Sequence, residues 1–246
     1  MSVRSFVAAL LAFTMLTSVA AAQEGGPSDG NVFRWDGGRW VQVEGFGTRI
    51  SVAPDGSPWV VNSRNEIFRS VNGHFERMPG RATDIGIGGD GSVWIIGTDA
   101  GIYRWNGKEW NRVSGSGVAI SVDRSGAPWV VNASGEIHQW NGDRFINRSG
   151  RARDIGAGND VWIIGTDNQV YRRAATEWMP MGGSGVRVSA GAEGTAWVVN
   201  QAGEVFRWDN DAFRRVGGSA VDIGANATGD TWMVGTAGGR RRNPRR

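Results

Sequence analysis

The 246-residue sequence combines 39 glycines and 13 tryptophans with no cysteine and only two histidines, at a formal net charge of +3. Without cysteine the chain can form no disulfide, thiolate nucleophile or zinc knuckle, and His74 and His138 are too few for a histidine-built metal site or a Ser-His-Asp triad. The glycines follow no Gly-x-y period, so the composition excludes collagen and disordered chains and favours a globular fold with many tight turns.

The first 22 residues have the pattern of a secretory signal peptide. Arg4 precedes an apolar run from Phe6 to Leu16, and alanines at 20–22 offer a small-residue cleavage site. This run is too short to span a membrane, and no later segment reaches 18 apolar residues. We therefore predict export to the periplasm or the extracellular space, a short linker over residues 23–30, and a mature chain with no transmembrane segment.

The body of the chain is an internal repeat. Six tryptophans recur at intervals of 35, 35, 33, 35 and 35 residues, each in an apolar stretch such as PWVVN or VWIIG. They are Trp59, Trp94, Trp129, Trp162, Trp197 and Trp232. Repeats of this length without helical periodicity indicate the blades of a β-propeller, and we predict that each indole is buried between neighbouring blades.

Each repeat predicts four short antiparallel strands. A strand such as 49–53 leads through a Gly/Asp turn to the tryptophan strand, and an aromatic strand then turns back at dipeptides such as Asn106-Gly107, which favour tight hairpins. Six copies predict an all-β, six-bladed β-propeller of four-stranded antiparallel blades over residues 31–237. The chain begins with the outer two strands of one blade and ends with the inner two, so we expect the N-terminal strands to pair with the C-terminal strands and close the ring.

The predicted innermost strands alternate in sequence. Three of them begin Asp-Ile-Gly, at Asp84, Asp154 and Asp222, whereas two of the other three carry Arg49 and Arg187 in the position of the aspartate. We expect these arginines and aspartates to neutralise one another around the central channel. The alternative is that the three carboxylates hold a hard cation through oxygen ligands.

The outer strands supply candidate sugar contacts. A sugar site needs exposed aromatic faces flanked by amide or guanidinium donors. The third strand of each repeat ends in tryptophan in four copies but in Ser70 or Arg173 in the other two, a range that a core position would not tolerate. We predict that these tryptophans are partly exposed and contact sugar together with neighbouring polar residues: Trp35, Trp105, Trp140, Trp208, Arg34, Arg104, Arg207, Asn106 and Asn141. The alternative is a cross-strand aromatic pair within each blade.

Residues 238–246 form a basic tail, which we expect to be disordered. Five arginines fall in the last seven residues, whereas residues 23–239 carry 21 basic and 24 acidic side chains. The basic charge therefore lies outside the predicted fold, and the sequence does not support a nucleic-acid-binding face. The tail is either a solvated end or a segment attracted to an anionic surface.

The alternation of ISVAPDGSPWVVNSRNEIFR with DIGIGGDGSVWIIGTDAGIYRWNGKEW resembles the tectonin-repeat family, in six copies from Asn31 to Thr236. The resemblance implies a six-bladed propeller similar to the tachylectins and fish-egg lectins, and a lectin that binds bacterial lipopolysaccharide or other surface glycans. His138-Gln139 and the turn at Gly158–Val161, which is two residues shorter, depart from the repeat. The binding sites are therefore not expected to be equivalent.

Two other functions remain to be compared with this one. GDGSVWIIGTDAGIYRW is also similar to the propeller repeats of sensor-regulator ectodomains, which would make the chain a protein-interaction scaffold with a protein partner. An enzyme is not expected, because DGSPW and DGSVW lack the residue between Asp and Gly of sialidase-type Asp boxes, and Tyr103 and Tyr171 lie in the periodic aromatic position of the third strand. We expect no cofactor, no metal ion and a monomer.

Overall fold

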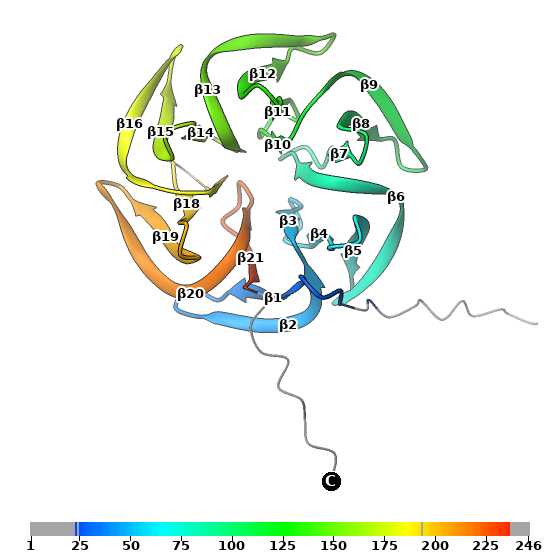
Figure 1. Ribbon diagram of the computed structural model, residues 1–246. Helices are drawn as coiled ribbons and strands as arrows, with labels where there is room; N and C mark the ends of the chain where they lie inside the picture. The colour runs from blue at the N-terminus through cyan, green and yellow to red at the C-terminus, as the bar shows by residue number, and fades with distance from the viewer. Residues whose placement is uncertain (1–22, 24, 193, 237–246) are drawn as a thin grey trace, which may run out of the picture.

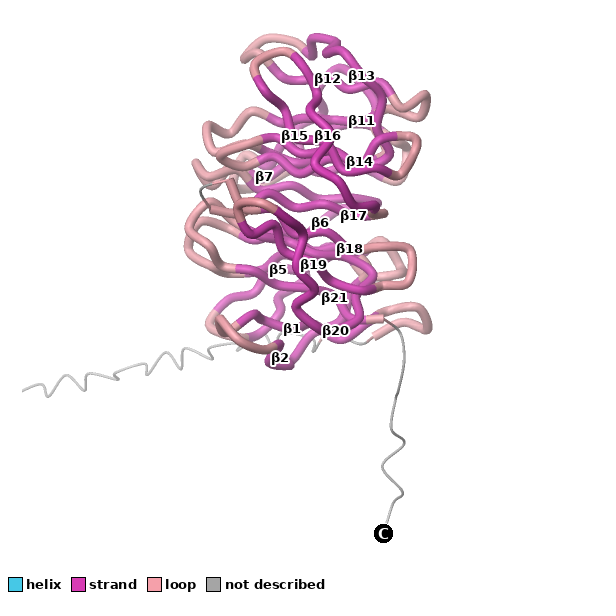
Figure 2. Tube along the Cα trace, turned by 90° about the vertical axis from the view of Figure 1, so that its left-hand side faces the viewer, coloured by secondary structure: helices cyan, strands magenta, loops and turns pink. Residues whose placement is uncertain are grey.

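The computed structural model describes residues 23, 25–192 and 194–236, so the predicted signal peptide (1–22) and basic tail (238–246) lie outside the described residues. Every regular element in this part of the chain is a β-strand. Figure 1 shows the strands arranged in sectors around a central axis, and Figure 2 shows loops gathered on two opposite faces of the resulting disc. Within the described residues there is no helix that could cross a membrane.

The described chain contains the following strands. They are β1 (Gly30–Trp35), β2 (Trp40–Gly47), β3 (Arg49–Val52), β4 (Pro58–Val61), β5 (Glu66–Val71), β6 (His74–Ile87), β7 (Val93–Gly97), β8 (Gly101–Trp105), β9 (Trp110–Ser116), β10 (Ala119–Val122), β11 (Pro128–Val131), β12 (Glu136–Trp140), β13 (Phe145–Ala157), β14 (Val161–Gly165), β15 (Gln169–Ala174), β16 (Glu177–Ser184), β17 (Arg187–Ala190), β18 (Ala196–Val199), β19 (Glu204–Asp209), β20 (Ala212–Ala225) and β21 (Thr231–Gly235).

The strands form three antiparallel sheets of seven, in the orders β3 to β9, β10 to β16, and β17 to β21 followed by β1 and β2. The long strands β6, β13 and β20 each pair with one neighbour along their first part and with another along their second part. Each sheet therefore holds two four-stranded units that share one long strand. Three curled sheets of this kind around one axis are consistent with a β-propeller.

We number the four-stranded units along the chain. Unit 1 contains the end of β20 with β21, β1 and β2, and unit 2 contains β3, β4, β5 and the start of β6. Unit 3 continues from the end of β6 through β9, and units 4, 5 and 6 begin with β10, the end of β13 and β17. We call the face that carries the loops between the first and second strands of the units the upper face.

The first and last strands close the ring, as the sequence predicts. β1 pairs with β21 so that Val32 faces Val234 and Arg34 faces Trp232, and Figure 1 shows the two strands side by side. The contact is close because Gly30 has no side chain, since a Cβ there would lie 1.7 Å from the carbonyl oxygen of Gly235. The two ends of the described chain thus complete one sheet that neither could form alone.

Five of the six repeat tryptophans are buried between units, as predicted, with at most 5% of each residue exposed: Trp59, Trp94, Trp129, Trp162 and Trp197. Each carries most of an indole out of water, which is among the largest hydrophobic contributions a single side chain can make. Trp232 is only half-buried. The reason is that unit 2 carries Ser70 where units 1, 3, 4 and 6 place a tryptophan against the preceding unit.

Candidate functional site

Alternating serine and aspartate side chains join the innermost strands around the axis. At every junction between successive units, one of these side chains accepts a hydrogen bond from a backbone N–H of the next unit, at 2.7–3.1 Å. The acceptor and donor pairs are Ser51 with Ile87, Asp84 with Ile120, Ser121 with Ala157, Asp154 with Val188, Ser189 with Ala225, and Asp222 with Ile50. The alternation seen in the sequence is thus a structural device that closes the ring.

The glycine of each Asp-Ile-Gly sequence permits this close approach. A Cβ on Gly156 would lie 2.8 Å from the Cα of Ser189, and one on Gly86 would lie 3.1 Å from the Cα of Ser121. Any larger residue would push the neighbouring units apart and lengthen the hydrogen bonds that the serine and aspartate side chains make.

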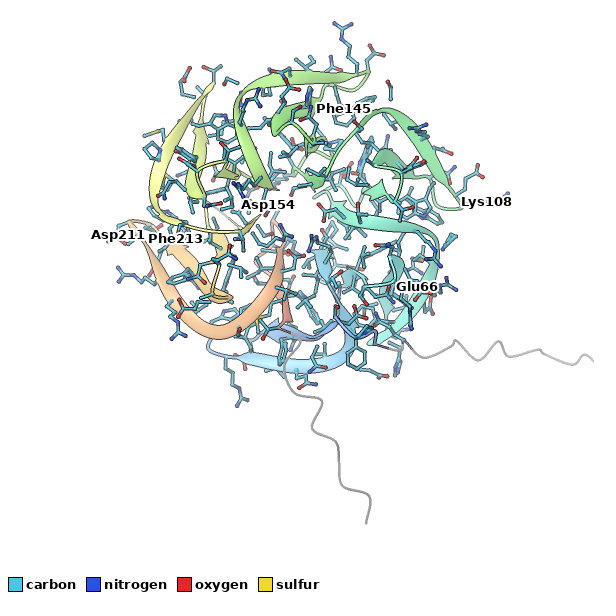
Figure 3. All side chains as sticks on the ribbon, viewed as in Figure 1. Glu66, Lys108, Phe145, Asp154, Asp211 and Phe213 are labelled. Carbon is cyan, nitrogen blue, oxygen red and sulfur yellow. The ribbon has the colours of Figure 1, made fainter. Side chains whose placement is uncertain are left out.

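Two arginines neutralise part of the aspartate charge, as predicted. Arg49 Nε lies 3.6 Å from Asp84 Oδ1, Arg187 Nη1 lies 3.9 Å from Asp154 Oδ1, and Arg187 Nε lies 3.5 Å from Asp222 Oδ1. Figure 3 shows Asp154 at the edge of the central opening. This part of the channel is therefore occupied by internal ion pairs.

Burial raises the pKa of all three aspartates, to about 7 for Asp84 and about 6 for Asp222. Arg49 opposes this shift most strongly at Asp84 and Asp222, and Arg187 does so at Asp154. Three carboxylates share two arginines because Ala119 stands in the position of a third. Among the described residues, no group of three or more Asp, Glu or His side chains is arranged to hold a metal ion.

The predicted rim tryptophans lie between units. Trp208 is only 8% exposed, so the prediction that it is partly exposed is wrong, whereas Trp35, Trp105 and Trp140 are half-buried. The physical reason is that these rings pack against the preceding unit, as Trp35 does against Trp197 at a ring-centroid distance of 5.6 Å. Ser70 and Arg173 are tolerated in the other two copies because they change the packing at one junction only.

The alternative of cross-strand aromatic pairs is confirmed for all four tryptophans. The ring centroids lie 4.9–5.1 Å apart, with the planes tilted or edge-to-face, an arrangement that aromatic pairs favour. The pairs are Trp35–Trp40, Trp105–Trp110, Trp140–Phe145 and Trp208–Phe213. One face of each predicted sugar platform is therefore already covered by protein.

The three predicted arginines lie on the third strand of their units, each directly opposite the repeat tryptophan of the neighbouring strand. Arg104 lies over the ring of Trp94 at 5.4 Å, and Arg207 lies over Trp197 at 5.9 Å. Arg34 is exposed and faces Trp232 across the β1–β21 pairing. A guanidinium stacked on an indole keeps donors free at its edge, so Arg104 and Arg207 stabilise their units and still present hydrogen-bond donors to solvent.

The two predicted asparagines shape hairpins. Asn106 Oδ1 accepts hydrogen bonds from the backbone N–H groups of Lys108 and Glu109, at 2.9 and 2.8 Å. Asn141 does the same in unit 4, at 3.0 and 2.8 Å. Both residues are exposed, but their acceptor oxygens are used within the turn, and only their amide N–H2 groups face outward unpaired among the described contacts.

The two tyrosines hold the lower loops. Tyr103 donates a hydrogen bond from its hydroxyl to Asp99 Oδ2 at 2.8 Å, and Tyr171 does so to Asp167 at 2.7 Å. The hydrogen bond to the carboxylate stabilises the protonated form of each tyrosine hydroxyl and so raises its pKa. A hydroxyl that holds its proton more tightly than usual is a poor nucleophile, which agrees with the packing role predicted for this position.

A groove of about 430 Å3 lies between units 5 and 6. Its walls are mainly apolar and include two phenylalanine rings; the lining residues are Val170, Met181, Gly182, Gly183, Ser184, Val198, Asn200, Phe206, Asp211, Ala212 and Phe213. Figure 3 shows Phe213 and Asp211 toward the outer rim, near β16 and β20. We call this feature the aromatic groove.

The aromatic groove is open because small residues stand at its mouth. At the equivalent junction between units 1 and 2, Glu44 and His74 meet across the opening, with Oε2 and Nδ1 3.6 Å apart. Between units 5 and 6 these positions hold Gly182 and Ala212. The sequence contains this signal, but it becomes visible only when the sixfold repeat is aligned position by position.

The rings on the floor of the aromatic groove are correspondingly more accessible. Phe206 and Phe213 are half-buried, whereas their counterparts in unit 2, Phe68 and Phe75, are only 4% and 7% exposed. Accessible aromatic rings beside polar groups are what a sugar site requires. None of these groove residues was predicted from the sequence to contact sugar.

Comparison with known proteins identifies the repeat. The family model of the Tectonin domain matches residues 16–103, 82–168 and 150–240. Tectonin-2 of Physarum polycephalum is 49% identical over 37 residues, which is 15% of this chain and 10% of that protein. The chain thus matches about a tenth of the length of this curated relative.

Several solved structures share the fold. The WD40 β-propeller domain of Doa1 has a TM-score of 0.60 at 13% identity over 85% of this chain and 84% of its own. The GH74 xyloglucanase from Xanthomonas campestris has a TM-score of 0.53 at 17% identity, over 82% of this chain and 37% of its own. YCF48 bound to D1 peptide has a TM-score of 0.50 at 14% identity, over 80% of both chains. At such identities the likeness concerns the propeller fold alone.

Proposed function

This chain belongs to the tectonin family, and on that premise we propose that it is a lectin-like binding protein that recognises bacterial lipopolysaccharide or other surface glycans without catalysis. We count its four-stranded units as the six blades of the propeller. Export through the N-terminal segment would place the protein in the periplasm or outside the cell, where such glycans occur.

The observation that carries the proposal is the aromatic groove. Phe206 and Phe213 offer ring faces on which the C–H groups of a sugar can rest. Ser184 and Asp211 line the same groove and supply a hydroxyl and a carboxylate, which sugar hydroxyl groups need as hydrogen-bond partners. The volume of about 430 Å3 lies in the range that ligand pockets occupy.

The rim residues predicted from the sequence form a second proposed contact surface. Trp35, Trp105 and Trp140 each keep an edge at the surface, and the exposed amides of Asn106 and Asn141 lie beside two of them. This surface is secondary in the proposal because the hidden ring faces are unavailable for stacking.

A hydrolytic role has little support in the aromatic groove. Most glycoside hydrolases place two carboxylates on either side of the bond that they cleave. The described lining of the groove contains one acidic residue, Asp211, and its Oδ1 lies 3.2 Å from Arg214 Nη2 at the exposed surface. An exposed carboxylate that pairs with arginine suits hydrogen bonding to a sugar better than proton donation to a leaving group.

The alternative function is a protein-interaction scaffold. It is favoured by the structural similarity to YCF48 bound to D1 peptide, because that protein shares the propeller fold and holds a peptide. In this case the aromatic groove would receive an apolar side chain of a protein partner.

A competition experiment separates these functions. We expect the protein to bind immobilised lipopolysaccharide, and the soluble polysaccharide released from the same lipopolysaccharide to reduce the bound fraction at least tenfold, because both would occupy the same sugar site. The measurement is surface plasmon resonance with increasing competitor. An absence of binding, or binding that the polysaccharide leaves unchanged, would contradict the lectin proposal and favour the scaffold.

A further inference from the structure

A polar hollow on the upper face begins at the mouth of the central channel and continues outward over unit 5. It consists of a cavity of about 300 Å3 at the mouth and one of about 730 Å3 beside it. Both are lined by Arg124, Gly158 and Asn159, so they adjoin each other. We call them together the upper furrow; no residue of the aromatic groove lines it.

The upper furrow exists because the first loop of unit 5 is short. This loop, 158–160, is two residues shorter than its counterpart in unit 3, 88–92, which accounts for the single 33-residue interval in the repeat. In unit 3 the loop reaches over the next unit, since a Cβ on Gly126 would lie 2.0 Å from the carboxylate of Asp90. Unit 5 lacks the residues needed to cover its neighbour in this way.

The aspartate of the short loop is turned toward its own unit. Asp160 Oδ1 lies 3.0 Å from Arg172 Nη2, and the guanidinium of Arg172 lies over the ring of Trp162 at 5.6 Å. A Cβ on Gly194 in unit 6 would lie 3.4 Å from the Asp160 carboxylate, a looser contact than its unit 3 counterpart. Asp160 and Arg172 are therefore held in place within unit 5, and no loop residues extend over the furrow from this unit as they do in unit 3.

Among the described residues, the guanidinium of Arg124 makes no ion pair, and Arg124 lines both cavities of the upper furrow. Arg124 is exposed, and among the described residues its guanidinium contacts only Asn159 Oδ1, at 3.4 Å. Of the two described carboxylates that line the furrow, Asp160 pairs with Arg172, and Asp123 accepts hydrogen bonds from the uncharged N–H and hydroxyl groups of Ser125. Arg124 thus presents unused donors beside a cavity.

The mouth of the channel is asymmetric. The side chains that surround it come from the ends of the innermost strands and are large in units 2, 3 and 4 but small in units 5, 6 and 1: Val52, Ile87 and Val122 against Ala157, Ala190 and Ala225. The side of the mouth lined by the alanines therefore lies next to the short loop 158–160, and Arg124 lines the same cavity. An apolar floor of methyl groups can accept the C–H face of a small ring.

We propose that the upper furrow binds a sugar-sized anion, with its carboxylate or phosphate on Arg124 and its ring on the alanine side of the channel mouth. A guanidinium can bind either oxyanion through two parallel N–H···O hydrogen bonds. Asn159 is placed beside Arg124 to bind a neighbouring hydroxyl group. The site is separate from the aromatic groove and does not depend on the glycan-binding function proposed for it.

The test is isothermal titration calorimetry of the mature protein with glucuronate, glucose 6-phosphate and glucose. We expect at least one of the two anions to bind at least tenfold more tightly than glucose, and the tighter one identifies the group that Arg124 holds. Arg124→Gln should remove this preference, because the amide keeps hydrogen-bonding capacity but loses the charge. Arg112→Gln, at an exposed arginine outside the furrow, should leave the preference intact.

A second variant tests the cause of the furrow. Insertion of Gly-Ser after Asn159 restores the loop length found in unit 3 and should abolish anion binding while the thermal unfolding temperature stays within a few degrees. The proposal is overturned if neither anion is preferred to glucose, or if both Arg124→Gln and the insertion bind the anion as the unmodified protein does. Because these probes are monosaccharides, failure here leaves lipopolysaccharide binding to be judged on its own assay.

Discussion

Replacing Trp162 with alanine is expected to lower the free energy of unfolding by about 3–5 kcal/mol, the usual cost of truncating a fully buried large aromatic side chain. Trp162 has none of its surface exposed. Its ring centroid lies 5.8 Å from that of Trp208 and 6.2 Å from that of Phe213 in the next unit, and Arg172 covers it at 5.6 Å. The substitution would therefore leave a cavity between two units that no neighbouring side chain can fill.

Equilibrium denaturation by urea, followed by tryptophan fluorescence, measures this loss. Met179→Ala is the matched control on the same unit, because Met179 is 53% exposed and exposed substitutions usually change stability by less than about 0.5 kcal/mol. If Trp162→Ala lowered the free energy of unfolding no more than this control, the buried indole would not stabilise the contact between units as the repeat predicts.

Asp222→Ala is expected to cost about 2–4 kcal/mol, because it removes a buried acceptor and leaves its donors unpaired. Asp222 Oδ2 accepts the N–H of Ile50 at 2.8 Å, which joins unit 1 to unit 2 beside the closure of the ring. Its other oxygen lies 3.5 Å from Arg187 Nε. Relief of repulsion from the other two channel aspartates offsets part of the loss, which is why the expected cost stays below that of Trp162→Ala.

Asp222→Asn provides the control, since an amide oxygen can still accept the hydrogen bond from Ile50. We expect it to retain most of the stability, and hydrogen exchange of the Ile50 amide should be fast in Asp222→Ala and slow in Asp222→Asn. Equal stability of the two variants would mean that the hydrogen bond across this junction contributes little to closing the ring.

The architecture could be predicted because every repeat carries the same physical signals. The tryptophan intervals predicted which indoles lie between units, and the Asn-Gly dipeptides predicted hairpins. The chain begins with two outer strands and ends with two inner strands of one unit, which implied the β1–β21 pairing that the structure contains. The Asp-Ile-Gly sequences marked the channel, although the pairing of Asp84 and Ser51 with backbone N–H groups of the next unit requires knowledge of which strands are neighbours in space.

The candidate site was harder to predict because its residues are defined by what they lack. Trp208 was expected to be partly exposed because its position varies between copies, but the variation reflects different packing at each junction. The aromatic groove arises where Gly182 and Ala212 replace the bulkier Glu44 and His74. Such an absence gives no motif in a single unit and acquires meaning only when two junctions are compared in three dimensions.

The most direct test of the account fills the aromatic groove. Ser184 faces Gln169 in the β15–β16 pairing just as Phe46 faces Asn31 in unit 1, so Ser184→Phe introduces a side chain that the fold already accepts at an equivalent position. Ser116→Phe makes the same change between units 3 and 4 and serves as the matched control. We predict that the affinity for lipopolysaccharide falls at least tenfold in Ser184→Phe and is unchanged in Ser116→Phe. Undiminished binding by a folded Ser184→Phe variant would contradict the assignment of glycan recognition to this groove.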